Sequence, residues 1–290
     1  VIARLMRDGR FSYPRILEGV EAELRNGATL RAKIQEDLNA LHNRMIRWLD
    51  RFFPEFTHVF KNFGKMAFAV LEKTPLPIDI QGKTPEELLF LYLTKAKQLI
   101  ELAPQSIGLQ EGLVMARFEI ATLLTQYHMM QAQLDDLSNQ LSELAHQMTD
   151  YDYLASVPGI GDVTIVELLS EVGSLTQYEH PRQLIKLAGL TLRENSSGQQ
   201  KGQKRISKRG RRKLRALLFR VMMPLIRHNP AFKQYHEYYT SRTVNPLRKK
   251  QSIVVLCGKL LKILHALCKK KQRFNEQQMM NDFTTLQAAA

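Results

Sequence analysis

The sequence has little cysteine. Cys257 and Cys268 both lie in an apolar stretch with helical spacing, eleven residues apart. On one helix this spacing puts their α-carbons about 16 Å apart, which excludes a disulfide between them. Two cysteines without CxxC spacing also exclude a cysteine zinc site. Such usage is typical of a reducing compartment, and a cytoplasmic location is predicted.

Long apolar runs are also lacking. No run in the sequence is long enough to span a bilayer, and no signal peptide is found. A basic membrane-surface protein is disfavoured too, because no helix joins a lysine-rich polar face to bulky apolar anchors. We therefore expect no membrane partner. The apolar fraction of 44% is enough for a packed core.

Acidic residues are scarce in one half of the chain. Residues 1–150 hold 17 basic and 19 acidic side chains, whereas residues 151–290 hold 25 basic and 9 acidic ones. A half this positive destabilises its own compact state by repulsion unless a polyanion is near. The imbalance therefore predicts a nucleic-acid partner for the second half.

Alternation typical of a large sheet is missing, whereas helical spacing is frequent, so a mainly α fold is predicted. Residues 1–9 have the pattern of the last turns of a helix. A long helix is expected from near Ile16 to Pro54, with one apolar stripe on its surface. Residues 57–106 are less regular, although Thr84 to Glu87 is typical of a capped helix start.

The most regular repeat covers residues 113–148. Its apolar positions step by three and four for five heptads, which predicts a coiled coil. An ordinary amphipathic helix is the alternative. The spacing leaves open whether the partner is the earlier long helix or a second copy of the chain. The repeat consists of Leu113, Ala116, Ile120, Leu123, Tyr127, Met130, Leu134, Leu137, Leu141, Leu144 and Met148.

The composition changes at residue 151, where the basic half begins. We expect a small all-α domain here, with long coiled-coil helices before it. Its helices are predicted at residues 163–172, 180–188, 209–227, 230–240 and 250–270. They are separated by turns that contain glycine, proline and serine.

A PGIG motif lies near the start of the basic half and resembles a helix-hairpin-helix element. Glycines let the backbone approach a phosphate closely, and the next helix would point its free N–H groups at the same place. Such contacts hold the sugar-phosphate backbone without reading the base sequence. A tight turn that only packs two helices is the alternative. The predicted contact residues are Pro158, Gly159, Ile160, Gly161 and Thr164.

A strongly basic segment follows the polar loop at residues 191–202. Nine of the fifteen residues from 201 to 215 are basic and none is acidic. A solvated face or flexible tail is the usual interpretation, but Leu214, Leu217 and Leu218 continue the segment into an anchored helix. If about six cations meet phosphates, affinity should fall with salt at a log–log slope near −5. The predicted contacts are Gly198, Lys201, Lys204, Arg205, Ser207, Lys208, Arg209, Arg211 and Arg212.

Catalytic patterns are weak when judged from spacing alone. No Ser-His-Asp arrangement occurs, so the serines of the polar loop have no evident activating base. Asp150, Asp152 and Asp162 are interpreted as helix caps or turn residues. His128 and His146 are too far apart on their helix to form a metal pair.

Taken in order, three segments resemble one family. They are SVPGIGDVTIVELLSEVG, then QLIKLAGLTLRENSSGQQKGQKRISKRGRRKLRALLF, and finally GKLLKILHAL. They are similar to the C-terminal domain of insertion sequence 110 transposases (the insertion sequence 116/110/902 group). These are DEDD-type recombinases guided by a bridge RNA. The resemblance implies an RNase H-like remnant at residues 1–13, a helical coiled-coil region at 14–150 and the transposase domain at 151–290.

The resemblance also implies a mechanism. Four carboxylates of the RNase H-like domain bind magnesium, and a serine attacks a DNA phosphate. That serine lies in a Ser-Gly step six residues after a Gly-Leu-Thr threonine, which here is Thr191. The match makes Ser197 the expected nucleophile, with Ser196 as the fallback. Lys201, Arg205, Lys208 and Arg209 would neutralise phosphates of DNA or guide RNA.

The chain departs from the family where its metal site is expected. The last two family carboxylates precede the VIA-type segment, whereas here the first acidic residue is Asp8. We therefore expect a fragment that binds no metal, and that binds nucleic acid without cutting it. A homo-oligomer through the coiled coil is expected. The alternative is a non-catalytic helix-hairpin-helix module, binding DNA or RNA, with a dimerising coiled coil.

Overall fold

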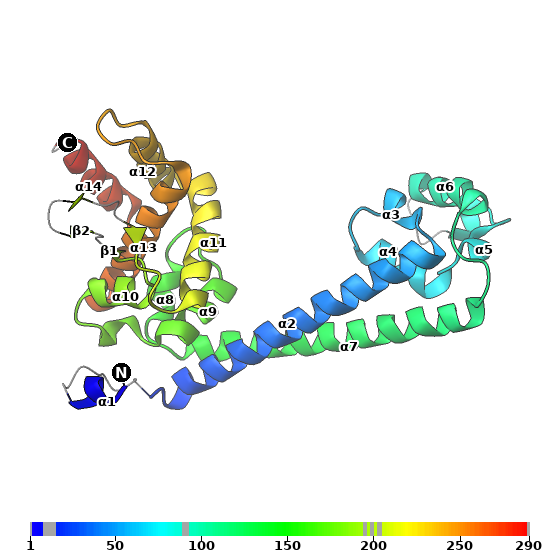
Figure 1. The fold of residues 1–290 in the computed structure, drawn as a ribbon, viewed down its shortest axis with the longest axis horizontal. Helices are drawn as coiled ribbons and strands as arrows, with labels where there is room; N and C mark the ends of the chain where they lie inside the picture. The colour runs from blue at the N-terminus through cyan, green and yellow to red at the C-terminus, as the bar shows by residue number, and fades with distance from the viewer. Residues whose placement is uncertain are drawn as a thin grey trace. The chain divides into compact units, whose positions relative to one another are not determined.

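The computed structural model describes residues 2–7, 16–88, 93–193, 196–197, 200–201 and 205–288. Helices make up nearly all the regular structure of these residues, which confirms the mainly α prediction (Figure 1). The chain forms two compact units. The first contains Val1–Thr29 and Ser138–Ala290, and the second contains Leu30–Leu137.

The second unit is built from two long helices and the short helices between them. The long helices are α2 (Gly19–Phe52) and α7 (Leu113–His146), each of which contributes most of its length. The short elements are α3 (Phe56–Val59), α4 (Lys65–Lys73), α5 (Pro77–Ile80), η1 (Pro85–Leu88), α6 (Leu93–Leu102) and η2 (Ala103–Gln105).

The heptad stripe of α7 packs against α2 of the same chain. In the second unit, the indole Nε1 of Trp48 donates to the carbonyl of Ala116 at 3.0 Å, and Arg51 pairs with Glu119 at 2.7 Å. In the first unit, a Cβ atom on Gly27 of α2 would lie 2.5 Å from Leu141 Cδ2. The partner left open by the spacing is therefore α2. A homo-oligomer stays a prediction, and it would need a different face of α7.

Local signals placed the ends of these helices well. The long helix ends at Phe52, before Pro54, but it begins at Gly19 instead of near Ile16. The Thr84 amide donates to the Glu87 carboxylate at 2.6 Å, as the capping pattern predicts. The element that follows is a short 3₁₀ helix, Pro85–Leu88. Near the N-terminus, α1 spans Ile2–Arg7, in the segment predicted to end a helix.

Among the described residues, eight helical elements of the first unit lie in the basic half. Five of them match the predicted helices: α9 (Asp162–Val172), α10 (Pro181–Leu187), α11 (Arg212–His228), α12 (Pro230–Ser241) and α13 (Lys249–Lys270). The others are α8 (Tyr151–Ala155), η3 (Leu175–Gln177) and α14 (Glu276–Ala288). The start of α12 shows why boundaries were predictable. Asn229 caps it by accepting from the amides of Ala231 and Phe232 at 3.1 and 3.3 Å, and Pro230 takes the first position.

Helix α13 is the central helix of the first unit. It contacts α8, η3, α10, α11 and α12, and its buried residues include Leu256, Leu260 and Leu264. It is also long and apolar enough to cross a membrane, whereas no such run was predicted from the sequence. Half of its most apolar stretch is buried within the fold. Because five elements pack on it, we interpret α13 as a core helix.

The prediction of a purely α-helical basic half was incomplete. Where described, the segment expected to be a polar loop forms antiparallel pairs. β1 (Leu192–Arg193) pairs with β4 (Arg205–Ile206), and β2 (Ser196–Ser197) pairs with β3 (Gln200–Lys201). These residues are mostly polar and show no apolar alternation, so the pattern that reveals half-buried strands was missing.

The compact units have other limits than residues 14 and 151, and the domains that the family resemblance implies stay a prediction. The limits differ because the first turns of α2 and the last turns of α7 pack with the basic half. The Glu21 carboxylate accepts from the Ser174 amide at 2.8 Å, and Leu24 is fully buried. These ends are therefore part of the same core as α8 to α14.

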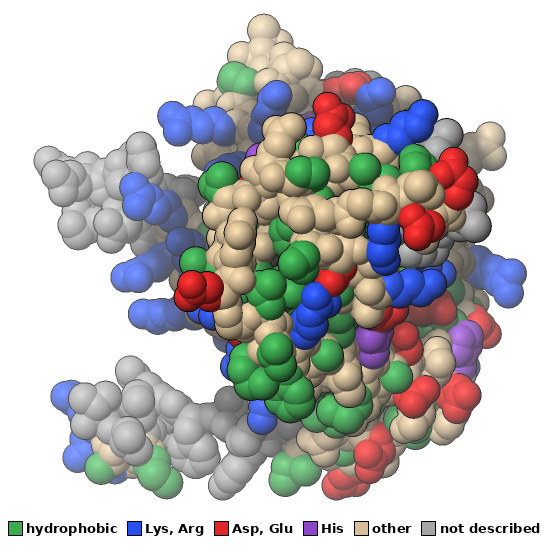
Figure 2. Space-filling model, turned by 90° about the vertical axis from the view of Figure 1, so that its right-hand side faces the viewer, with side chains coloured by type: hydrophobic (Ala, Val, Ile, Leu, Met, Phe, Trp, Pro, Cys, Tyr) green, Lys and Arg blue, Asp and Glu red, His purple; other side chains and the backbone are tan. Residues whose placement is uncertain are grey.

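The second unit exposes several large apolar side chains. Figure 2 shows groups of apolar side chains among charges of both signs on one face. On α7 the exposed residues Val114 and Phe118 lie off the heptad stripe, which α2 covers. The others near this end of the unit are Ile78, Ile107, Leu109 and Met115.

Candidate nucleic-acid interface

The basic segment that follows β4 is fixed to the end of α10 by backbone hydrogen bonds. The Ser207 amide donates to the Thr191 carbonyl at 2.7 Å, and the Lys208 amide donates to the Gly189 carbonyl at 3.0 Å. The Arg211 amide donates to the Leu187 carbonyl at 2.7 Å. These bonds confirm that the segment is anchored and exclude a flexible tail for residues 207–211.

Two glycines make this close backbone contact possible. A Cβ atom on Gly210 would lie 2.3 Å from the Leu187 carbonyl oxygen, and Gly210 has a φ of +147°. A Cβ atom on Gly189, where φ is +68°, would lie 2.9 Å from the Arg209 carbonyl oxygen. Residues with side chains at these positions would push the backbone of residues 187–189 away from that of residues 208–210. Lys208 adopts a left-handed φ of 54° in the same turn.

Two arginines of this region serve the fold. The Arg211 guanidinium contacts the Glu171 carbonyl and lies 3.7 Å from the Glu171 carboxylate. Arg215 donates to the carbonyls of Ala188 at 3.1 Å and Lys208 at 3.3 Å. Arg211 was predicted to contact nucleic acid, but its guanidinium is already engaged with Glu171.

The Ser207 hydroxyl also supports the turn, because it accepts from the Arg209 amide at 3.3 Å.

The remaining cations of the segment face solvent. Arg205, Lys208, Arg209, Arg212 and Lys213 are all exposed. Within the described part of the chain, no carboxylate forms a salt bridge with any of them. Five cations held this close on an anchored backbone repel one another, and a polyanion would relieve that repulsion.

The start of α11 adds to this positive field. A helix N-terminus carries a partial positive charge, so acidic residues are favoured in its first turn and basic ones are disfavoured. The first turn of α11 has no acidic residue, and Arg212 and Lys213 occupy its first two positions. Each basic residue near this helix end costs a few tenths of a kcal/mol to about 1 kcal/mol of stability. An anion bound at the same place would interact favourably with both the helix end and the basic residues.

The PGIG motif forms the turn between α8 and α9. Gly159 has a φ of +97°, and the Ile160 amide donates to the Val157 carbonyl at 3.1 Å. Gly161 caps α9 in an extended conformation, and Pro158, Gly159 and Gly161 are exposed. Ile160 is buried, and therefore anchors the turn. Thr164 is half-buried, and its amide donates to the Gly161 carbonyl at 2.9 Å. The helix-hairpin-helix interpretation stays a prediction.

An acidic residue tempers the positive end of α9. Asp162 occupies the first position of the helix and accepts from the Tyr151 hydroxyl at 2.6 Å. Burial, this hydrogen bond and the charges of Asp162 and Asp152 raise the pKa of Tyr151 to about 12. A phosphate at this turn would therefore meet a nearby negative charge, which makes the turn the weaker of the two predicted phosphate contacts.

Helix α11 connects the turn to the basic segment. A Cβ atom on Gly159 would lie 2.9 Å from Leu225 Cδ2, near the C-terminal end of α11. Arg212 begins the same helix, thirteen residues earlier. At a rise of about 1.5 Å per residue the two contacts are about 20 Å apart along the helix axis. That distance equals about six steps of a nucleic-acid strand at ~3.4 Å per step.

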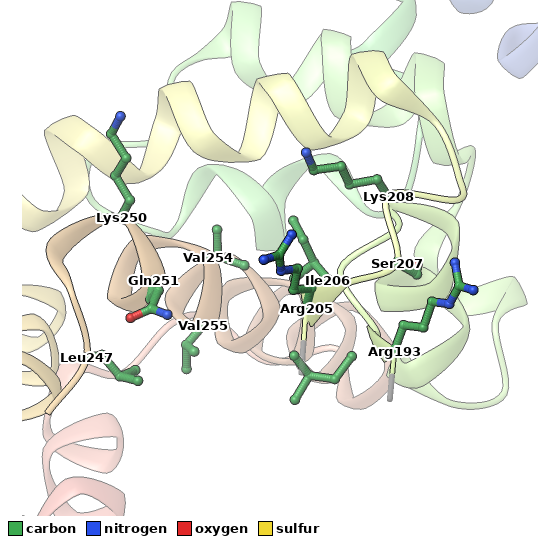
Figure 3. A pocket seen from close by; sticks show the side chains of 11 residues that line it. Arg193, Arg205, Ile206, Ser207, Lys208, Leu247, Lys250, Gln251, Val254 and Val255 are labelled. Atoms are coloured by element: carbon green, nitrogen blue, oxygen red, sulfur yellow. The ribbon is translucent and has the colours of Figure 1, made fainter. Parts of the chain in front are cut away.

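A groove of about 1270 Å³ lies beside the basic segment (Figure 3). One wall consists of the paired strands β1 and β4 and the residues after them. The other wall is the start of α13, whose residues were not among the predicted nucleic-acid contacts. The groove is lined by Leu192, Arg193, Arg205, Ile206, Ser207, Lys208, Leu247, Lys250, Gln251, Val254 and Val255.

The predicted nucleophile lies only partly within the described residues. The backbone pairing places Ser197 opposite Gln200 and Ser196 opposite Lys201. The side chains of these residues, and the whole of Gly198 and Lys204, lie outside what the structure describes. The chemistry of Ser197 therefore stays a prediction.

The described residues contain no group of three or more His, Cys, Asp and Glu side chains that could hold a metal ion. Both cysteines are buried in α13, and burial raises the pKa of the Cys257 thiol to about 12. Burial also raises the pKa of Cys268. These thiols are poor nucleophiles and poor ligands at neutral pH.

An anchored basic segment, a glycine turn and a cationic groove on one helical unit are suited to binding a polyanion. Residues 151–237 match the protein family described as the Transposase IS116/IS110/IS902 family. The matched region runs from α8 into α12 and includes the PGIG turn, β1 to β4 and the basic segment. It thus contains most of the surface described above.

Curated relatives agree with this match. The chain is 28% identical over 141 residues to the transposase for insertion sequence element IS1111A of Coxiella burnetii, covering 49% of this chain and 39% of the relative. It is 30% identical over 148 residues to the pilin gene-inverting protein of Moraxella bovis, covering 50% and 44%. The Moraxella lacunata pilin gene-inverting protein is 28% identical, covering 50% and 46%. These similarities support an insertion-sequence transposase or recombinase family member, although the matches cover less than half the length of these relatives.

Proposed function

We propose that this chain is the DNA-binding part of an insertion-sequence transposase of the 110 group, which recombines DNA at the ends of a mobile element. The observation that carries the proposal is the basic segment at residues 205–213. Its backbone is held by hydrogen bonds to α10, and its exposed cations have no carboxylate partner among the described residues. Because the backbone of this segment is already fixed, only the side chains lose freedom when they meet phosphates, which lowers the entropic cost of binding.

The contacts we assign are to phosphates. Arg205, Lys208, Arg209 and Arg212 bind consecutive phosphates, and the PGIG turn binds the backbone about six steps away. These contacts position the protein without reading the base sequence. Recognition of a particular site then belongs to another element or to a guide RNA, which we propose as a second partner.

For the chemistry, we propose that the hydroxyl of Ser197 attacks a DNA phosphodiester. A bond forms between Ser197 Oγ and phosphorus, the bond from phosphorus to one deoxyribose oxygen breaks, and that oxygen takes up a proton. The serine proton goes to a base. A terminal hydroxyl of another strand reverses the step and frees the serine, so joining requires no external energy source. Ser196 is the alternative nucleophile.

The full reaction needs more than the described residues supply. We propose that magnesium is bound by carboxylates outside this chain, that the active protein is an oligomer, and that it works in the cytoplasm. The alternative is a module that binds DNA or RNA without catalysis. The two differ in one measurement, because only a recombinase forms a covalent protein–DNA link.

The experiment uses the chain joined to the N-terminal domain of a related transposase, incubated with labelled element ends, the guide RNA of that element and magnesium. We expect Ser197→Ala to abolish both strand joining and the covalent adduct seen on denaturing gels, with DNA affinity within about twofold of the parent. Thr191→Ser is the matched control and keeps activity. A fully active Ser197→Ala protein would remove Ser197 from the mechanism, and activity lost only in Ser196→Ala would assign the role to Ser196.

A further inference from the structure

The groove between β4 and the start of α13 carries an inference that rests on the proposed DNA-binding function and deepens it. We propose that this groove binds a segment of unpaired DNA strand. Its cations hold the phosphates, and the apolar side chains on its two walls cover the bases. Figure 3 shows that the lining comes from two segments of the chain, one around Arg205 and one around Lys250.

The charge of the lining selects an anion. Arg193, Arg205, Lys208 and Lys250 line the groove, and none of the other described residues in its lining is acidic. Lys250 also lies in the first turn of α13, which has no acidic residue. A lysine is disfavoured there by the helix dipole, so a neighbouring anion improves the local electrostatics.

The apolar side chains on the two walls favour an unpaired strand over a duplex. Leu192 is 66% exposed and Val255 is 42% exposed, and Val254 lies beside them in the lining. A duplex hides its bases and presents sugar and phosphate outward, so these side chains would gain little from it. An unpaired strand exposes base faces that apolar side chains can cover. A volume of about 1270 Å³ also exceeds the range of about 300–1,000 Å³ typical of pockets for single small ligands, which suits an extended ligand.

The polar lining favours DNA over RNA. A protein that selects RNA offers partners to the 2′-hydroxyl, which is both a donor and an acceptor. Both side-chain acceptors among the described lining residues already accept hydrogen bonds within the fold, which leaves them less capacity for a 2′-hydroxyl. Gln251 Oε1 accepts from the Arg248 amide at 2.9 Å, and Ser207 Oγ accepts from the Arg209 amide and the Thr191 hydroxyl. The exposed Leu192 and Val255 match the apolar edge of deoxyribose better than a hydroxyl.

The test measures fluorescence anisotropy of labelled oligomers with the 290-residue chain. The probes are an oligodeoxyuridylate of about 12 nucleotides, a duplex of the same length, and the matching oligouridylate, which differs only in its 2′-hydroxyls. The variant is Val255→Asp, which puts a carboxylate in the α13 wall of the groove. Val244→Asp is the matched control, since Val244 is exposed and does not line the groove.

We expect Val255→Asp to weaken binding of the single-stranded DNA about tenfold and of the duplex by less than about threefold, while Val244→Asp changes each by less than about twofold. Equal losses on both DNA probes, or no loss, would overturn the inference while leaving duplex binding and the proposed function intact. Tighter binding of the oligouridylate, lost in Val255→Asp, would assign the groove to RNA. Failure of the parent chain to bind any probe would instead reject the proposed function.

Folding of each variant is checked by thermal melting followed by circular dichroism. If Val255→Asp does not fold, Leu192→Asp makes the same test from the opposite wall, because Leu192 is largely exposed on β1. The expected selective loss for single-stranded DNA is the same. Retention of full single-strand affinity in folded Leu192→Asp would count against the groove.

Discussion

The anchoring of the basic segment can be broken at one residue, Gly210. In Gly210→Ala the new Cβ would lie 2.3 Å from the Leu187 carbonyl oxygen and 2.7 Å from the Gly189 nitrogen, which are backbone atoms. The φ of +147° adds strain of about 1–3 kcal/mol for a residue with a side chain. Relief requires the segment to move away from α10.

That movement breaks the hydrogen bonds from the Arg211 amide to Leu187 and from the Lys208 amide to Gly189. At about 1 kcal/mol each, their loss brings the total destabilisation to about 3–5 kcal/mol. Domains are stable by about 5–15 kcal/mol, so the change is large but can leave the chain folded. DNA affinity should fall as well, because the backbone that carries the exposed cations is no longer held in place.

The assay is urea unfolding followed by circular dichroism, together with anisotropy of a labelled duplex. Gly258→Ala is the matched control, since a Cβ on that glycine of α13 would meet nothing within 4 Å. Alanine is the better helix former, so this control should gain about 0.5–1 kcal/mol and bind DNA like the parent. A Gly210→Ala protein with parental stability and parental DNA affinity would refute the argument that close backbone contact holds the segment.

Three further predictions address other parts of the molecule. The pKa of Tyr151 is raised to about 12 from an ordinary value near 10, so its stabilising contribution is complete below pH 10 and is lost as the pH rises towards 12. Urea unfolding should therefore show the advantage of the parent over Tyr151→Phe shrinking across that range, and a constant difference would contradict this. Buried Cys257 and Cys268 should not react with a thiol-specific disulfide reagent at pH 8 until urea is added, and rapid labelling of the native chain would show that α13 is exposed. Sedimentation at micromolar concentration should find dimers or larger assemblies; a monomer would count against the predicted oligomer.

The helices of the basic half were predictable because local chemistry sets their ends. Pro181 and Pro230 begin α10 and α12, and the apolar spacing of α11 and α13 follows the helical period. The same local rules placed the end of α2 before Pro54. Helix α14 was not predicted; its buried Met279 and Phe283 pack on a core that the tail alone does not reveal.

The candidate site was predictable only where its residues are close in sequence. The basic run was evident from composition, and the structure shows which cations stay exposed and which, such as Arg211, support the fold. The strand pairs were missed because the segment is polar and its pairing depends on contacts across the chain. The α13 wall of the groove was missed for the same reason, although the run Arg248, Lys249 and Lys250 at a helix start was a visible signal.

The most direct test of the central claim is the salt dependence of duplex binding by the 290-residue chain and by a variant with Lys208→Gln, Arg209→Gln and Arg212→Gln. Each phosphate contact contributes about 0.9 to the log–log slope for duplex DNA. We predict a slope near −5 for the parent and about 2.7 units shallower for the variant. Equal slopes for the two proteins, or no binding by the parent at low salt, would contradict the assignment of this segment to phosphate binding.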